Sequence, residues 1–371
     1  MLREMSRFAD VSLVSLAHDR HEAAMLPEVP FARHATALRV TAVRNAAKGL
    51  WRLSSNIPLT HSLLDAAALR STVRQVVASR RIDVAVAYCS GMARLAFDPA
   101  LAPVPFVLDM VDVDSAKWAR LAAATGGLRR WVYQREARTL RDFEITIVGH
   151  ARTTLVVNER ERDVLRELAP NAQVVAVANG IDLDAFAPAA EPRASSQVVF
   201  CGVMSYAPNV EGVTWFAKEV WPVVRASRPD ARFVIVGADP SREVRALAAG
   251  DPSIAVTGAV PAVQPYLWDA ALAVAPLRIT QGLQNKVLEA LAAGLPVVTT
   301  PPVVAGLPVE AQPGCLVAAD AVAFADTVLR WLAASPDARR AQTALADLHS
   351  LSWSMQLRPL EAILRRATAS P

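Results

Sequence analysis

Gln281-Gly-Leu-Gln-Asn-Lys-Val-Leu-Glu-Ala-Leu-Ala-Ala-Gly-Leu-Pro-Val-Val-Thr-Thr300 is the stretch that decides the fold of this chain. A predicted helix opens at Gly282 and continues over 286–293, where a Gly-Leu-Pro sequence ends it with glycine at the C-terminus and proline just beyond. Residues 297–300 then form a short apolar strand of the kind that is buried in a parallel sheet. The stretch therefore predicts a loop, a helix, a tight turn and a buried strand.

Two charged side chains stand out in this otherwise apolar helix. Lys286 and Glu289 are three residues apart and share a face, and Gly282 lies one turn earlier on that face. An anion at the helix N-terminus would meet free N–H groups, the positive end of the helix dipole and the Lys286 ammonium. Glu289, one turn deeper, could accept hydrogen bonds from two hydroxyls. This order suits the phosphate and ribose of a nucleotide diphosphate; the alternative is an exposed face with a weak Lys–Glu pair.

The sequence KVLEALAAGLPVVTT, which begins at Lys286, resembles the nucleotide-sugar signature of retaining glycosyltransferases of family 4. These enzymes have the two-domain GT-B fold, and two glutamates eight residues apart handle their donor. The resemblance implies that Glu289 contacts the ribose and that Gln281 stands where the other glutamate contacts the donor sugar. Gln281 departs from the family, because an amide hydrogen-bonds sugar hydroxyls but carries no negative charge.

The composition predicts a well-buried globular protein of two domains. The chain has 371 residues, 53% of them hydrophobic and 20% charged. No run approaches the roughly 20 apolar residues that span a bilayer, and the N-terminus does not read as a secretory signal. The three cysteines are far apart, with no metal spacing, as expected of core residues in a reducing compartment. We therefore expect a cytoplasmic protein.

The first half of the chain carries the basic character. Residues 1–178 hold 24 basic and 18 acidic residues, and the remainder holds 15 and 17. This surplus suits a membrane surface or an anionic acceptor, whereas nucleic acid is not expected because no recognition motif accompanies it. Arg44, Lys48 and Arg52 are four apart on one predicted helix face, which could lie on the inner face of the plasma membrane. The alternative is a solvated face with snorkelling side chains.

The first strand is predicted at residues 11–17, very early in the chain. Family 4 enzymes have a strand, a loop and a helix before it, so the resemblance implies that the first domain lacks its first βα unit. Residues 82–89 and 105–111 are near-continuously apolar and predict buried parallel strands.

Asp112 follows the second of these strands, at the carboxyl end where open α/β sheets place their ligands. We therefore expect Asp112 to face the cleft as a catalytic residue, together with Gln281 and Lys286. The surrounding DMVDVDSAKW resembles a subgroup of sugar transferases associated with exosortase and exopolysaccharide systems. Its alternating carboxylates are not expected to hold a metal, because the GT-B fold does not require one. The alternative for Asp112 is a carboxylate at a helix N-terminus.

The second half alternates strand and helix six times, which predicts a doubly wound parallel sheet. After its first strand, Gly202 permits close backbone approach and Asn209 is predicted to cap the next helix. No G-x-G-x-x-G follows a strand, so no dinucleotide cofactor is expected. Together with the motif residues, the predicted donor-binding set is Gly202, Asn209, Gly258, Val260, Arg278, Gly282, Leu283, Lys286 and Glu289.

These features predict two Rossmann-like domains facing each other across a cleft. The first covers 1–186 on the acceptor side, 187–196 is a linker, 197–352 binds the nucleotide sugar, and a helix over 353–371 crosses back to the first domain. The predicted function is transfer of a sugar from a nucleotide diphosphate sugar to a saccharide or lipid-linked acceptor in exopolysaccharide or cell-envelope glycan synthesis, and the resemblance to family 4 implies retention of configuration. The alternatives are another GT-B class, an epimerase or a phosphorylase, and a non-catalytic protein that binds the nucleotide sugar.

Overall fold

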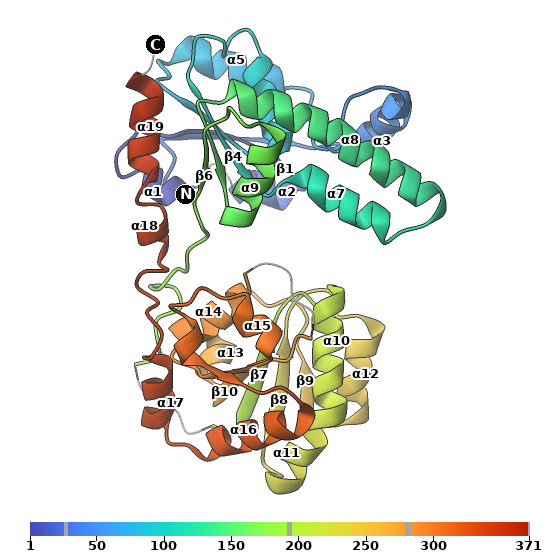
Figure 1. Ribbon diagram of the computed structural model, residues 1–371, viewed down its shortest axis with the longest axis vertical. Helices are drawn as coiled ribbons and strands as arrows, with labels where there is room; N and C mark the ends of the chain where they lie inside the picture. Colours follow the sequence, from blue (N-terminus) through green and yellow to red (C-terminus); the bar gives the residue numbers. More distant parts are fainter. Residues whose placement is uncertain (26–28, 191–194, 279–282, 370–371) are drawn as a thin grey trace. The chain divides into compact units, whose positions relative to one another are not determined.

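The computed structural model describes residues 1–25, 29–190, 195–278 and 283–369, and the chain folds into two compact α/β units. Unit 1 comprises Met1–Asn179 and Gln356–Pro371, and unit 2 comprises Gly180–Met355. The sequence predicted a linker over 187–196 and a return at 353. In the structure the chain passes to unit 2 at Gly180, before the predicted linker. It returns to unit 1 at Gln356, just after the predicted return (Figure 1).

Unit 2 contains one parallel sheet of six described strands in the order β12-β11-β10-β7-β8-β9. Almost every residue of the four central strands is buried, as their apolar sequences require. The strands are β7 (Gln197–Cys201), β8 (Arg232–Val236), β9 (Ile254–Val256), β10 (Leu272–Ala275), β11 (Val297–Thr299) and β12 (Cys315–Val317).

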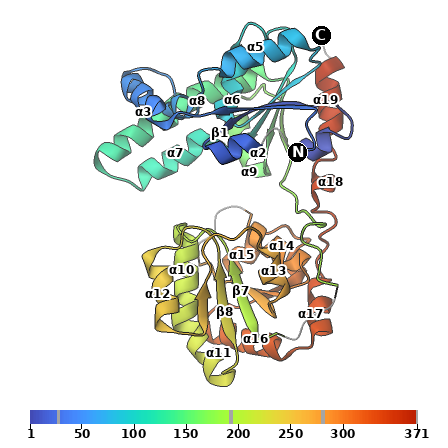
Figure 2. The same ribbon diagram turned by 180° about the vertical axis from the view of Figure 1, so that it is seen from behind.

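Helices cover both faces of this sheet, so unit 2 is doubly wound (Figures 1 and 2). Its core is aromatic on one side, where Phe216, Trp221 and Phe233 stack with ring centroids 4.7 to 6.1 Å apart. The helices are α10 (Ala207–Trp215), η4 (Phe216–Val220), α11 (Trp221–Ser227), α12 (Arg242–Gly250), α13 (Gln264–Trp268), α14 (Asn285–Ala292), α15 (Pro301–Ala305), η5 (Gln312–Gly314), α16 (Ala321–Ala333), α17 (Pro336–Thr343) and α18 (Trp353–Gln356).

The strand order of unit 2 reverses at one place. From β7 the chain adds β8 and β9 on one side and then returns to add β10, β11 and β12 on the other. The segments that follow β7 and β10 therefore diverge at the carboxyl edge of the sheet between these two strands. Open α/β sheets bind their ligands at such a switch point.

Unit 1 contains a four-stranded parallel sheet in the order β3-β4-β5-β6 and a separate parallel pair, β1-β2. In the described residues no ladder joins β1 to β3, so the early strand of the sequence does not share the sheet of its neighbours. The strands are β1 (Ser12–Ala17), β2 (His34–Arg39), β3 (Ala85–Tyr88), β4 (Phe106–Val111), β5 (Thr153–Val156) and β6 (Val174–Ala176).

Two helices of unit 1, α7 and α8, pack against each other as a hairpin (Figure 1). The C-terminal helix α19 contacts β4 within the same unit. The helices are α1 (Leu2–Met5), α2 (Arg20–Met25), α3 (Ala42–Trp51), η2 (Arg52–Ser54), α4 (Leu59–Leu63), α5 (Leu69–Ser79), α6 (Ser90–Ala93), η3 (Arg94–Phe97), α7 (Asp114–Ala123), α8 (Gly127–His150), α9 (Glu159–Leu168) and α19 (Leu360–Ala369).

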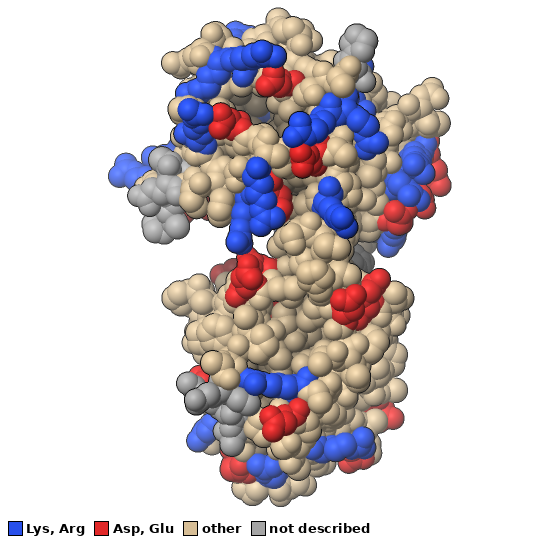
Figure 3. Space-filling view, turned by 90° about the vertical axis from the view of Figure 1, so that its left-hand side faces the viewer, with Lys and Arg blue, Asp and Glu red and all other residues tan. Residues whose placement is uncertain are grey.

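Lys and Arg side chains are spread over the face of unit 1 that Figure 3 presents, in keeping with the basic surplus of the first half of the sequence. Within the described part of the chain, no helix combines the length and the apolar character that a bilayer crossing requires.

Candidate functional site

Lys286 lies in the first turn of α14, at the switch point of unit 2. The helix buries Val287, Leu288 and Leu291 against the sheet, and this fixes the direction of the Lys286 side chain. Its Nζ donates to Asn209 Oδ1 over 2.6 Å and stands 4.6 Å from the centroid of the Phe200 ring. The contact joins the helix after β10 to the helix after β7, so it bridges the point where the strand order reverses.

The Lys286 ammonium is charged at neutral pH. Burial, opposed by the nearby Cys201 and Glu289, lowers its pKa to about 8. In the described residues it forms no ion pair, and its partners are an amide oxygen and an aromatic face. Burial also raises the pKa of Glu289, which is half-buried on the same helix. A partly buried cation that forms no ion pair within the described residues favours an anionic ligand.

Asn209 does not cap a helix, and that prediction was wrong. Helix α10 begins at Ala207 with Tyr206 as its N-cap, so Asn209 falls inside the first turn. The side chain is buried; its Nδ2 donates to the Val203 carbonyl over 2.9 Å and its Oδ1 accepts from Lys286. Asn209 therefore orients the lysine and anchors the loop after β7 at the same time.

Glycines bring the backbone close at this edge of the sheet. Gly237, the residue after β8, has φ +151°, and a Cβ on it would lie 1.7 Å from the Gly202 carbonyl oxygen. The Gly202 N–H donates to the Val236 carbonyl over 2.9 Å, and the Gly237 N–H donates to the Gly258 carbonyl over 3.2 Å. A Cβ on Gly202 would come 3.1 Å from Lys286 Nζ. The three glycines thus add no side chains of their own to the edge beside Lys286.

Sequence reasoning selected Gly202 and Gly258 but missed Gly237. The same signal, a glycine directly after an apolar strand, marks Gly237 in the sequence RFVIVG. Among the other predicted donor residues, Val260 and Leu283 are half-buried and pack on the core of unit 2, and Arg278 is exposed.

Gln281 and Gly282 lie outside the described residues, and so does the predicted helix start at Gly282; the described helix begins at Asn285. The roles assigned to all these residues stay predictions.

Asp112 follows β4 at the carboxyl edge of the sheet in unit 1 and is exposed. Its N–H donates to the Met110 carbonyl over 2.9 Å. Partial desolvation of the carboxylate raises its pKa, the neighbouring Glu161 and Asp114 raise it further, and Lys117 and Arg120 oppose the shift. The residue therefore stands among side chains of both charges.

Two non-glycine residues at this edge adopt left-handed backbone conformations. Cys89, after β3, and Val111, at the end of β4, both have φ +67°. Such a φ is rare for a β-branched residue and costs on the order of 1–3 kcal/mol. The Cys89 N–H donates to the Asp109 carbonyl over 2.7 Å, and the Asp109 carboxylate accepts from the Val111 N–H over 3.2 Å. These bonds tie the two strained residues to one strand.

Carboxylates hold the start of α7. Glu144 accepts from the Ser115 N–H over 2.9 Å and from the Ser115 hydroxyl, and Glu161 accepts from the Val113 N–H over 2.8 Å. Burial raises the pKa of Glu144 to about 7 and that of Asp109 to about 6. Ser90 donates to Asp114 over 2.6 Å. Most of these groups position backbone, whereas the Asp112 carboxylate is exposed.

No group of three or more His, Cys, Asp or Glu side chains comes together as a metal site in the part of the chain that the structure describes.

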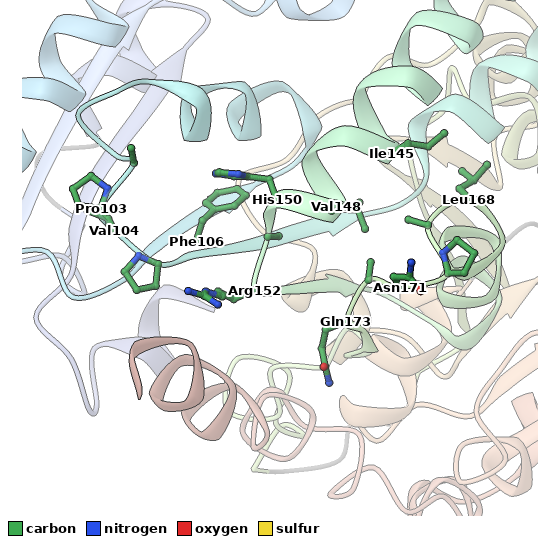
Figure 4. Close-up of a pocket in the computed structure, with 17 residues that line it drawn as sticks. Pro103, Val104, Phe106, Ile145, Val148, His150, Arg152, Leu168, Asn171 and Gln173 are labelled. Carbon is green, nitrogen blue, oxygen red and sulfur yellow. The ribbon is translucent and has the colours of Figure 1, made fainter. Parts of the chain in front are cut away.

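A cavity of about 920 Å³ lies in unit 1, at the opposite edge of the sheet (Figure 4). Its lining includes Pro105, Arg152 and Gln173, which directly precede β4, β5 and β6. The His150 ring packs between Phe97 and Phe106, at centroid distances of 5.2 and 6.1 Å. The cavity includes none of the predicted site residues. Ligands of such sheets bind at the carboxyl ends of the strands, so the switch point beside Lys286 is the candidate site.

Residues 195–334, most of unit 2, match the family model of glycosyl transferases group 1. No curated protein matches the chain in sequence.

Solved structures match nearly the whole chain. The sucrose-phosphate synthase of Thermosynechococcus elongatus is 15% identical, with a TM-score of 0.64 over 97% of this chain and 100% of that chain. HepE of Anabaena in complex with UDP is 10% identical, with a TM-score of 0.62 over 98% and 94%. The UDP-forming trehalose-phosphate synthase of Burkholderia xenovorans is 13% identical, with a TM-score of 0.61 over 97% and 100%. At these identities the likeness shows the fold, which is that of the GT-B glycosyltransferases.

Proposed function

We propose that this protein is a glycosyltransferase that takes a nucleotide diphosphate sugar as donor. The observation that carries the proposal is the Lys286 ammonium, held by Asn209 at the switch point of unit 2 beside a glycine-lined sheet edge. The match of residues 195–334 to group 1 glycosyltransferases supports it. HepE, which has a similar fold, is recorded with UDP.

In this proposal the donor lies along the carboxyl edge of unit 2. The diphosphate accepts hydrogen bonds from Lys286 and from backbone amides near Gly282, with Arg278 as a second cation. Glu289 accepts from the ribose hydroxyls one helical turn deeper. Gln281 contacts the donor sugar, and the backbone of Gly258 and Val260 contacts the base. Leu283, Gly202 and Asn209 shape the loops around the diphosphate.

Bond cleavage places negative charge on the leaving diphosphate. Lys286, already desolvated and fixed by Asn209, stabilises that charge without reorganisation. This requires no metal or other cofactor. Asp112 contributes from unit 1 as the residue that contacts the acceptor hydroxyl, and its exposed carboxylate can accept a hydrogen bond from it. The acceptor attacks on the face that the diphosphate leaves, so the anomeric configuration is retained.

The finer assignment rests on the sequence resemblance. We propose membership of glycosyltransferase family 4, close to the exosortase-associated and exopolysaccharide-associated subgroup. The acceptor is a saccharide or a lipid-linked saccharide, and the product enters an exopolysaccharide or a cell-envelope glycan. The protein acts in the cytoplasm, at the inner face of the plasma membrane.

The proposal is tested by incubating the full chain with a panel of labelled nucleotide diphosphate sugars, with and without saccharide and lipid-linked acceptors. We expect release of nucleoside diphosphate that depends on the acceptor and falls at least tenfold in Lys286→Ala. Interconversion of the sugar without an acceptor would identify an epimerase instead. Nucleotide binding without any turnover would favour a non-catalytic protein, and either result would overturn the proposal.

A further inference from the structure

Trp51, Ile57, Leu128 and Trp131 are four of the large hydrophobic side chains that unit 1 exposes. The exposed fraction is 83% for Trp51, 78% for Leu128, 52% for Trp131 and 41% for Ile57. They come from two segments far apart in the sequence: the end of α3 with the loop after it, and the first turns of α8. Scattered exposed apolar residues need no explanation, whereas a group of this size marks an interaction surface.

A buried arginine brings the two segments together. Arg135 of α8 donates its Nε to the Leu53 carbonyl over 2.9 Å, and its Nη2 to the carbonyls of Arg52 and Ile57 over 2.9 and 3.0 Å. Trp131 and Leu128 lie one and two turns before Arg135 on the same helix face. Arg135 thus holds the segment that carries Trp51 and Ile57 on the helix that carries Trp131 and Leu128. Figures 1 and 2 both show α3 beside α8.

The next residue of α8 fixes the same loop from its other end. Glu136 is buried and accepts from the N–H groups of Leu59 and Thr60, both over 2.8 Å. The position of the loop on α8 is thus set by hydrogen bonds at two neighbouring helix residues. The exposed apolar side chains beside it are held in place by the fold.

The surroundings of these apolar residues carry positive charge. Residues 34–64 and 115–135 contain no aspartate or glutamate. Arg129 and Arg130 stand beside Leu128 and Trp131, are exposed, and form no ion pair in the described part of the chain. The nearest acid on α8, Glu136, is buried and pairs with Arg135 at 3.4 Å. The basic residues of the two stretches are Arg39, Arg44, Lys48, Arg52, Lys117, Arg120, Arg129, Arg130 and Arg135.

The helix face of Arg44, Lys48 and Arg52, which the sequence predicted, is less available for binding than Arg129 and Arg130. Lys48 pairs with Asp65 at 3.0 Å, and Arg52 donates to the Ser62 hydroxyl over 3.3 Å, so both side chains bond within unit 1. The side chain of Arg44 lies outside what the structure describes.

We propose that Trp51, Ile57, Leu128 and Trp131, flanked by Arg129 and Arg130, form a docking surface for an anionic lipid bilayer. Tryptophan favours the interface between water and hydrocarbon, where its apolar ring and its polar N–H are both satisfied. Each arginine close to an anionic leaflet contributes about 1 kcal/mol. The complete lack of acidic residues in both segments is the complementarity that an anionic surface requires. The assignment does not depend on the donor chemistry of unit 2.

The test is co-sedimentation of the full chain with vesicles of phosphatidylcholine alone or mixed with phosphatidylglycerol. We expect binding only to the anionic vesicles, and loss of at least about tenfold in affinity in Arg129→Glu/Arg130→Glu. A similar loss is expected in Leu128→Ser/Trp131→Ser. The matched controls lie in unit 2: Arg242→Glu/Arg245→Glu makes the same change of charge, and Val322→Ser replaces a valine that is 73% exposed.

Binding of a nucleoside diphosphate should be unchanged in every variant, which shows that the protein is folded and keeps this test separate from that of the glycosyltransferase function. The proposal would be overturned if both double variants still bind anionic vesicles. It would also be overturned if the wild-type protein does not bind anionic vesicles. Sedimentation velocity identifies the competing occupant. If the wild type is a dimer and Leu128→Ser/Trp131→Ser dissociates it, the surface binds a second copy of the chain. That result would overturn the proposal of a bilayer-binding surface.

Discussion

The carboxyl edges of the two parallel sheets have opposite chemistry. In unit 2 the edge is lined by glycines and presents one desolvated cation, Lys286. In unit 1 the corresponding edge presents carboxylates, of which Asp112 is exposed and has a raised pKa. The same topology thus yields one edge with a desolvated cation and one with an exposed carboxylate. The difference supports our proposal that the donor binds at the edge of unit 2 and that Asp112 of unit 1 contacts the acceptor hydroxyl.

The two edges also obtain their geometry differently. In unit 2, glycine removes side chains so that Gly237 packs directly on Gly202. In unit 1, Cys89 and Val111 adopt left-handed conformations that cost free energy, and hydrogen bonds to Asp109 hold them there. Close packing is disrupted by adding one carbon atom, whereas a strained residue tolerates removal of its side chain. The predictions below exploit this contrast.

The largest effect is expected at Gly237. A Cβ would lie 1.7 Å from the Gly202 carbonyl at a φ that L-residues rarely adopt, so Gly237→Ala must displace the backbone. We expect a loss of about 3 kcal/mol or more in the free energy of unfolding. Chemical denaturation measures it, and Gly250→Ala is the control because nothing lies within 4 Å of its Cβ. Equal stability of the two variants would contradict the close approach.

The pH dependence of donor binding should follow Lys286. Its pKa of about 8 means that the ammonium is charged below this pH and neutral above it. The dissociation constant of a nucleoside diphosphate should therefore be constant up to about pH 7 and rise about tenfold by about pH 9. Calorimetric titration across this range measures the effect. Lys286→Arg should lose the dependence, because guanidinium stays charged. A flat wild-type profile would remove Lys286 from the site.

The smallest effect on stability is expected at Val111. Glycine adopts φ +67° freely, so Val111→Gly relieves strain while adding entropy to the unfolded chain. We expect the free energy of unfolding to change by no more than about 1 kcal/mol, whereas turnover falls because Asp112 is less firmly held. Its ladder partner Val156 is the control: it is buried, and Val156→Gly should cost about 3 kcal/mol. Similar destabilisation at both positions would argue against strain at Val111.

Most of the fold was predictable from local patterns. The buried strands of unit 2 appear as apolar runs, and the position of Lys286 and Glu289 on one helix follows from their spacing. The start of α12 also follows a local pattern, because Ser241 is its N-cap and the Ser241 hydroxyl accepts from the Val244 N–H over 3.2 Å.

What the sequence could not provide is long-range geometry. Asn209 looked like a helix cap because its residue type favours caps, yet it bonds a lysine 77 positions further along the chain. The approach of Gly237 to Gly202 joins two loops after different strands. The left-handed conformations of Cys89 and Val111 arise from their place in the sheet, since neither residue type favours them. The separation of β1-β2 from β3 is likewise a property of the folded unit.

The most direct measurement compares two ligands, a nucleoside diphosphate and pyrophosphate, by calorimetric titration into the wild type, Lys286→Ala and Glu289→Gln. Our account predicts that Lys286→Ala weakens both ligands by about tenfold or more, since a charge-assisted contact is worth roughly 1.5–3 kcal/mol. Glu289→Gln should weaken the nucleoside diphosphate and leave pyrophosphate unchanged. Unaltered affinity in a folded Lys286→Ala, or an equal loss of both ligands in Glu289→Gln, would contradict the donor site.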